Sequence, residues 1–374
     1  MKKLLTLLLS FVIVCVNPIT TMANAIVTIE RSDNTPYVFP VVPGSSEWEK
    51  FISKQDMVDA CQVPEDKLKN MTTEALLETV LNYPLITDYI AFNTFEDACN
   101  MVSSDFNGFN ELFSREDVTS VILNRYATSN VLYEINDNTD SKRFMEPATI
   151  EYLIVCNEIK NGKMNDEEAK QFAEIHNEKV IDRYQAEIYS ANSEVYLLQQ
   201  AGGTTKARAG EILTPVPVGT VKTPKGTNVQ DVYQRSPEVT DAEKEMYTRE
   251  IDSRYPHTSK LSEATVNYNC HSYAWYSTST SNPYWIGFYI VPDMYMTDGS
   301  YIQTTSNSLA TGTKMWYNNG EHSAIFRNYM TILGSVTMAA ESKWGMCGLY
   351  SHPYNHCPYY SEAGSITYWI RNNS

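Results

Sequence analysis

One cysteine and one histidine in the second half of the chain are placed where they could act together on an amide bond. Cys270 opens a helix-like run that ends near Tyr276, and His322 opens a strand-like run about fifty residues later. Glu341 ends the next strand-like run, nineteen residues after His322. A cysteine thiolate attacks a carbonyl carbon, an imidazole takes and returns its proton, and a third polar group orients the ring. The three positions therefore predict Cys270 as nucleophile, His322 as base and Glu341 as the orienting residue.

The predicted elements would help this chemistry. A helix N-terminus presents backbone N–H groups and a positive dipole end, which lower the pKa of a thiol there and favour the thiolate of Cys270. His322 follows the turn signal Asn318-Asn319-Gly320, so its ring could project from a sheet edge. An antiparallel neighbour strand would then bring Glu341 beside it. The oxyanion formed during attack needs donors, for which the Cys270 backbone N–H and the Asn269 side chain are candidates.

Other roles for these residues stay open. His352 or Ser342 could be the third member instead of Glu341, with Lys343 a further rival, and His271 is a less favourable base because it adjoins Cys270 in the helix. Cys270 could also be a buried structural thiol. A zinc site is a further alternative, since His and Cys are the usual zinc ligands. Its ligands would come from Cys270, His271, Cys347, His352, His356 and Cys357.

The remaining cysteines are too sparse for a disulfide-stapled mini-domain. In an extracellular protein, the pairs Cys347/Cys357 and Cys61/Cys99 are the first to test as disulfides. Cys156 lies in the apolar run Tyr152 to Cys156 and is expected to be a buried small hydrophobe.

In the first half of the chain, residues 26–43 read as an extended lead-in, and helical periodicity begins at Ser45. Residues 72–81 form the clearest predicted helix, with Thr72 as its N-cap. Further predicted helices are the run from Ser46, 95–102, 106–113, 115–126, 149–158 and 165–198. This half, residues 26–202, therefore reads as an all-helical bundle without a catalytic signature of its own.

Gly202-Gly203 marks a boundary, and residues 203–374 have a different composition, rich in Tyr, Trp, Ser, Thr and Asn. A helix is predicted from Thr240 to about Tyr255, and the helix at Cys270 follows it. Strands are predicted at 312–317, 322–327, 336–341 and 365–370. A helix followed by an antiparallel sheet is an α+β pattern, so we expect an α+β protein with two domains.

The N-terminus predicts export. Lys2 and Lys3 precede the apolar run Leu4 to Val16, and Ala23-Asn24-Ala25 fits a signal-peptidase site, so residues 1–25 are predicted to be a signal peptide. A lipid anchor on Cys15 is less favoured, because Val14 stands where a small residue is expected. No later stretch predicts a transmembrane span. The net charge of −16 disfavours nucleic acid as a partner.

Several motifs together resemble the CHAP and NlpC-like cysteine amidase/peptidase superfamily. They are Cys270-His271-Ser272-Tyr273-Ala274, residues 312–316, His322-Ser323-Ala324-Ile325 and Glu341, within roughly Thr265 to Ile370. The Asn-Cys-His, His-Ser-Ala and Glu-Ser-Lys-Trp-Gly combination is also similar to that of a group of secreted bacterial proteins. In two places the chain departs from the family pattern: His271 follows the nucleophile, and the strand before His322 lacks an acidic residue after Gly312.

The resemblance implies a papain-like fold that hydrolyses amides, often in cell-wall peptide, with Cys270, His322 and Glu341 in the roles given above. It implies no cofactor and no metal. A peptide or cell-wall substrate is the expected partner. The alternative is a non-catalytic surface-binding or interaction protein on a hydrolase-like scaffold.

Overall fold

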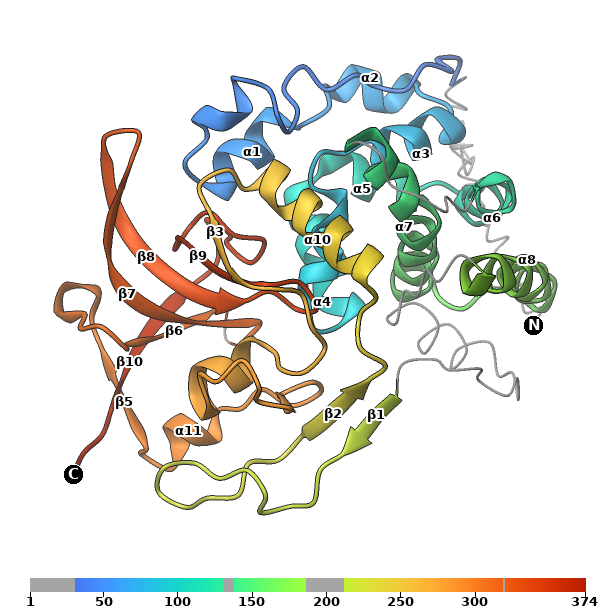
Figure 1. Cartoon of the computed structure of the whole chain (residues 1–374). Helices are drawn as coiled ribbons and strands as arrows, with labels where there is room; N and C mark the ends of the chain where they lie inside the picture. The colour runs from blue at the N-terminus through green and yellow to red at the C-terminus, as the bar shows by residue number, and fades with distance from the viewer. Residues whose placement is uncertain (1–30, 131–137, 186–211, 319) are drawn as a thin grey trace, which may run out of the picture.

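The fold is described from a computed structural model, which covers residues 31–130, 138–185, 212–318 and 320–374. The predicted signal peptide, Cys15 and the Gly202-Gly203 boundary lie outside these residues. The chain is an α+β protein in which the helices of the first half lie on one side and most strands of the second half on the other (Figure 1).

The described part of the first half is helical, as predicted. Its elements are η1 (Trp48–Lys50), α1 (Lys54–Ala60), α2 (Glu65–Asn70), α3 (Thr73–Leu81), η2 (Ile86–Ala91), α4 (Phe95–Asp105), α5 (Asn107–Phe113), α6 (Val118–Thr128), α7 (Asn138–Asn161) and α8 (Asp166–Gln185). Thr72 caps α3 by accepting a hydrogen bond from the Ala75 backbone N–H, which confirms the predicted start. The helix predicted from Ser46 is wrong: only three residues of 3₁₀-helix form there, and α1 begins later with Ser53 in a capping box.

The second half contributes the sheets and a few helices. Its elements are β1 (Ile212–Pro215), β2 (Val232–Ser236), α10 (Asp241–Arg254), β3 (Ser259–Ser262), η3 (Ser272–Tyr276), β4 (Trp285–Ile286), α11 (Met294–Thr297), β5 (Tyr301–Thr304), η4 (Ser306–Ser308), β6 (Lys314–Tyr317), β7 (His322–Ile332), β8 (Ser335–Lys343), β9 (Leu349–Pro353) and β10 (Ile366–Arg371). The seven-stranded sheet has the order β3-β9-β8-β7-β6-β10-β5, and its neighbours pair antiparallel. The second sheet has the order β1-β2-β4.

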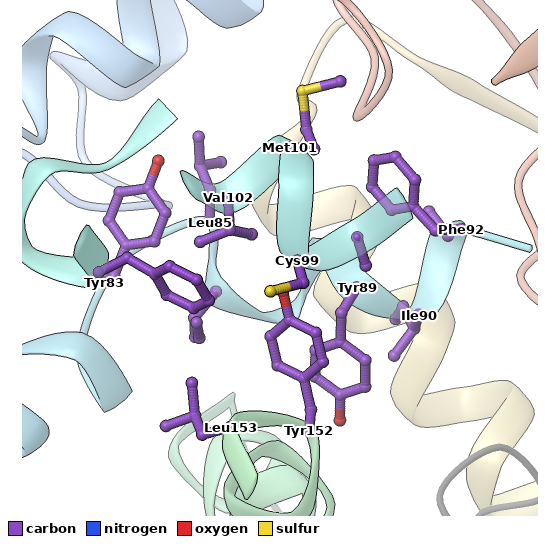
Figure 2. Close-up of a cluster of buried hydrophobic side chains, with 14 of the residues drawn as sticks. Tyr83, Leu85, Tyr89, Ile90, Phe92, Cys99, Met101, Val102, Tyr152 and Leu153 are labelled. Carbon is purple, nitrogen blue, oxygen red and sulfur yellow. The ribbon is translucent and has the colours of Figure 1, made fainter. Parts of the chain in front are cut away.

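The two halves share one hydrophobic core. The larger cluster of buried side chains runs from Phe39 in the first half to Tyr359 in the second. Figure 2 shows a part of it, where Tyr89, Ile90 and Phe92 lie against α4 and Tyr152 of α7. The Tyr89 and Tyr152 rings stack with centroids 4.6 Å apart. The segment around η2 is therefore anchored by apolar side chains on the helical side.

A buried polar contact ties α10 to the same segment. The Arg254 guanidinium is 3.0 Å from an Asp88 carboxylate oxygen, and both side chains are almost fully buried. The Tyr255 hydroxyl donates to the other Asp88 oxygen at 2.6 Å. Because a buried charge is costly without its partner, this contact favours one docking geometry of the two halves. In Figure 1, α10 accordingly lies between the helices and the sheet.

The large sheet has two different faces. On one face, η3 and a smaller apolar cluster with Trp275, Trp316 and Ile325 cover the strands. On the other face, Tyr317, Ala324 and further side chains join the shared core. Since strand side chains alternate between faces, neighbouring residues of β7 serve different environments.

Candidate active site around Cys270

Cys270 lies in the first turn of a short helix, as the sequence predicts. Residues 270–271 are helical and continue into η3, a single π-helical turn. The Asn269 side chain caps this helix, because its Oδ1 accepts a hydrogen bond from the Ser272 backbone N–H at 3.0 Å. The same amide bonds both backbone groups of Ile286 in β4, at 2.8 and 3.2 Å. Asn269, which was considered as an oxyanion donor, is thus already committed to holding the helix start.

Three N–H donors converge on the Cys270 sulfur. They come from the Ser323 backbone, the His271 backbone and the Asn93 side chain. Even so, burial raises the pKa of the Cys270 thiol to about 11, because the charged form loses its water, while the donors and the Lys343 ammonium lower it by less. Cys270 is only 1% exposed. The expectation of a lowered thiol pKa is therefore wrong for this arrangement: desolvation outweighs the helix N-terminus.

His322 immediately precedes the residue whose backbone N–H reaches the Cys270 sulfur, but its own ring forms no hydrogen bond with that sulfur. The backbone N–H that reaches the sulfur belongs to the next residue, Ser323. The His322 ring stacks on Tyr359, with centroids 3.6 Å apart and an interplanar angle of 7°. Among the described residues, neither ring nitrogen of His322 has a hydrogen-bond partner. Burial, with His352 and His271 nearby, keeps its pKa well below the ordinary value, so the ring is neutral.

Glu341 does not orient His322. Glu341 pairs with Ile325 across β7 and β8, so it shares a sheet face with Ile325, whereas His322 points to the opposite face. Its carboxylate instead accepts hydrogen bonds from the Tyr273 hydroxyl and from the Arg327 guanidinium. The predicted Glu341–His322 contact does not form, because the register of β7 against β8 puts the two side chains on opposite faces of the sheet.

The two alternatives for the third member lie on the face of His322. Ser342 follows Glu341 and therefore points to the opposite face, and His352 pairs with Ala340, which shares that face. The Ser342 hydroxyl lies 2.8 Å from the His352 Nε2 atom, and His352 Nδ1 lies 2.8 Å from the Pro353 carbonyl oxygen. Burial lowers the pKa of His352 to about 4. These polar groups are bonded to each other, not to His322.

His271 takes part in a separate buried network. Its Nδ1 lies 2.8 Å from the Ser323 hydroxyl, which also accepts a hydrogen bond of 2.8 Å from the Trp275 indole N–H. Burial lowers the pKa of His271 to about 3. The ring is thus neutral and holds η3 against β7, which fits a positioning role better than that of the base.

Asn93 belongs to the site although nothing in the sequence indicates it. It follows η2 in the helical half, 176 residues before Asn269, whose Nδ2 donates to the Asn93 Oδ1 at 3.5 Å. A polar residue in a loop carries no spacing or motif that connects it to a cysteine so far along the chain. Only the docking of the two halves brings its amide to the Cys270 sulfur.

The zinc and disulfide alternatives find no support. In the ranges that the structure describes, no group of three or more His, Cys, Asp or Glu side chains could hold a metal ion. All six cysteines there are buried and free, so the predicted Cys347/Cys357 and Cys61/Cys99 disulfides do not form. Cys156 is fully buried among apolar side chains, which confirms its predicted character.

Comparison of the chain with protein-family models, with curated proteins and with solved structures found no match. Among the helices of the described ranges, none combines the length and the apolar character that a bilayer crossing requires.

Proposed function

We propose that this protein is a secreted cysteine hydrolase with a papain-like catalytic region, which cleaves amide bonds in peptides such as those of peptidoglycan. Cys270 is the nucleophile and His322 the base. The observation that carries the proposal is the convergence of three N–H donors on one sulfur at the start of a capped helix. Export is supported by the pattern of Lys2, Lys3, the apolar run and Ala23-Asn24-Ala25.

The donors favour a catalytic thiol over a structural one. A buried cysteine that only fills space behaves as a small hydrophobe and needs no donors. Donors aimed at a sulfur stabilise the thiolate, and the same kind of group stabilises the oxyanion formed beside it. Cys156, by comparison, lies within α7 and is hydrogen-bonded to the side chains of Cys99 and Tyr152, and burial raises its pKa well above the ordinary value.

His322 fits the base because its ring nitrogens are uncommitted. A buried polar atom without a partner is rare in folded proteins and calls for an explanation. A base must be neutral and must have a free nitrogen, and His322 meets both conditions. To act as the base, its ring must leave the stack on Tyr359 and turn a nitrogen toward the sulfur.

The resting site is closed. With a thiol pKa of about 11, forming the thiolate at neutral pH costs about 5 kcal/mol. Proton transfer to His322 needs the ring rearrangement, and a substrate needs an opening to the buried sulfur. We therefore propose a latent enzyme, in which engagement of the substrate exposes the Cys270 sulfur while the two halves stay in contact.

The test is hydrolysis of purified peptidoglycan, with released amines measured by mass spectrometry. Cys270→Ala and His322→Gln should each abolish release, whereas Cys156→Ala, which removes another fully buried thiol, should retain it. Circular dichroism checks that each variant is folded. Unchanged release by folded Cys270→Ala would refute the proposal.

One observation favours a non-catalytic interaction protein instead. The tip of the β7–β8 hairpin exposes apolar side chains, with Tyr329 57% and Val336 73% exposed, beside a groove of about 390 Å³. Such a surface is typical of a binding site. On this alternative, the protein binds peptidoglycan without turnover, and Cys270→Ala and His322→Ala leave the affinity unchanged.

A further inference from the structure

The helical half reaches into the site through one short segment. Ile90 and Phe92 are each 2% exposed and anchor the chain in the shared core, as Figure 2 shows. Asn93, the next residue, is only partly buried and lies beside the Cys270 helix, where it contacts Asn269. Its place is thus set by the apolar neighbours that precede it.

We propose that Asn93 is a catalytic residue of the Cys270 site: its Nδ2–H group is the second donor of an oxyanion hole whose first donor is the Cys270 backbone N–H. This inference rests on the proposed hydrolase function. It gives the helical half a role in catalysis itself, so that the active site is built from both halves of the chain.

The orientation of the Asn93 amide supports this role. Asn269 Nδ2 donates to Asn93 Oδ1, which identifies the oxygen side of the amide and leaves the NH₂ group for the sulfur. The Cys270 N–H belongs to the first helical turn and has no acceptor within the helix. Both donors thus belong to groups beside the attacking sulfur, which is where the oxygen of an attacked carbonyl needs them.

Asn93 is not needed to start the next helix. Thr94 is the N-cap of α4, and its side chain accepts a hydrogen bond from the Asp97 backbone N–H at 3.1 Å. An asparagine before a helix is often explained by capping. Since Thr94 already fills that position, the Asn93 amide is left for another use.

The second half holds the segment from its other side. The Tyr359 hydroxyl donates to the Ala91 carbonyl, and the Cys347 thiol donates to the Ile90 carbonyl at 4.0 Å. Gly345 has a φ of +48°, and a Cβ there would come within 2.5 Å of the Ala91 oxygen. A side chain at position 345 would thus push the segment away, which indicates that its distance from the second half is tightly set.

The reaction would proceed as follows. The Cys270 thiolate attacks the carbonyl carbon, a C–S bond forms, and the π pair moves to oxygen, where Asn93 and the Cys270 N–H donate to it. Collapse re-forms the C=O bond and breaks the C–N bond, and the leaving amine takes the proton that His322 removed from the thiol. Water then cleaves the thioester, which yields a carboxylic acid and restores the thiol.

The test compares Asn93→Ala, the isosteric Asn93→Asp, which lacks the donor, and Asn93→Gln, which keeps it. Turnover of purified peptidoglycan and inhibition by the aldehyde acetyl-Gly-glycinal, which forms a tetrahedral adduct with a thiol, are measured in the full-length protein. We expect kcat to fall about 10²–10³-fold in the Ala and Asp variants with little change in KM. Aldehyde affinity should fall in parallel, and Gln should restore part of both.

Asn100→Ala, at an exposed position of α4, is the matched control and should behave like the wild type. Melting temperatures separate misfolding from loss of the donor, and the isosteric Asp variant serves if Ala does not fold. If the wild type turns over substrate, and kcat and aldehyde affinity of the Ala and Asp variants stay within about threefold of the wild-type values, the oxyanion role alone is overturned. No turnover by the wild type, with equal aldehyde binding by Cys270→Ala, would overturn the hydrolase function as well.

Discussion

The thiol of Cys270 should be almost unreactive in the folded protein at neutral pH. Only the thiolate reacts with iodoacetamide, and burial raises the pKa of this thiol to about 11. At about pH 7.5 roughly 0.03% of it is ionised, compared with about 10% of an unfolded cysteine with a pKa near 8.5. Ionisation alone therefore predicts labelling about 300-fold slower than in the unfolded chain, and the 1% exposure slows it further.

The assay is timed alkylation in native buffer and in concentrated urea, followed by digestion and mass spectrometry of the Cys270 peptide. The native rate should rise about tenfold per pH unit until the pH nears the thiol pKa. If native Cys270 were labelled within about tenfold of the unfolded rate at about pH 7.5, burial would not outweigh the helix N-terminus and its donors, and the reasoning would fail.

Lys343 offers a second check with a defined sign. Its ammonium lowers the Cys270 pKa, and burial lowers the pKa of Lys343 itself to about 7, so the charge is present below that pH and lost above it. Lys343→Met should therefore slow native labelling below pH 7 and change it little near pH 9. Lys170→Met, at an exposed position, is the control. An equal effect of Lys343→Met at both pH values would contradict the electrostatic cause.

Three further predictions follow from the contacts around the site. Glu341→Gln should lower the free energy of urea unfolding by about 1–3 kcal/mol, because the ion pair with Arg327 is lost, and should leave kcat within about threefold of the wild-type value. A hundredfold loss of kcat with unchanged stability would instead show that Glu341 is a catalytic residue. The His352 pKa is about 4 in the folded protein, so the unfolded chain binds its proton first as the pH falls below about 6.5. This residue should therefore remove about 1.4 kcal/mol of stability per pH unit down to pH 4. His352→Gln should flatten that slope in acid unfolding curves, and an unchanged slope would disprove the cause. Glutathione disulfide should join Cys99 to Cys156 before any other pair, because these two thiols share a hydrogen bond across α4 and α7; non-reducing peptide maps that show another bridge first would contradict this.

Local sequence signals predicted the elements that carry the site. Thr240 begins α10 with a capping box, as its spacing to Glu243 indicates. The turn before His322 and the apolar runs on either side predict β6 and β7, which the structure confirms. Cys270 also lies at a helix start, as expected. These features depend on residues within a few positions of each other, so local sequence patterns are enough to predict them.

The sequence did not predict how these elements meet. The register of β7 against β8 separates Glu341 from His322, and a shift of one residue would have reversed that result. Likewise, β9 was not predicted, although it carries His352. Strand pairing depends on partners far along the chain, and turn or periodicity signals do not specify it.

The chain's own pattern of residues was enough to establish the α+β class, the helix at Cys270 and the strand at His322. The protonation state of the Cys270 thiol and the position of Asn93 beside Cys270 depend instead on how the helical half packs against the second half. The pKa of a group depends on the water and the charges that remain around it after the protein has folded. Around Cys270 these neighbours include Asn93 and Asn269, which are 176 residues apart in the sequence.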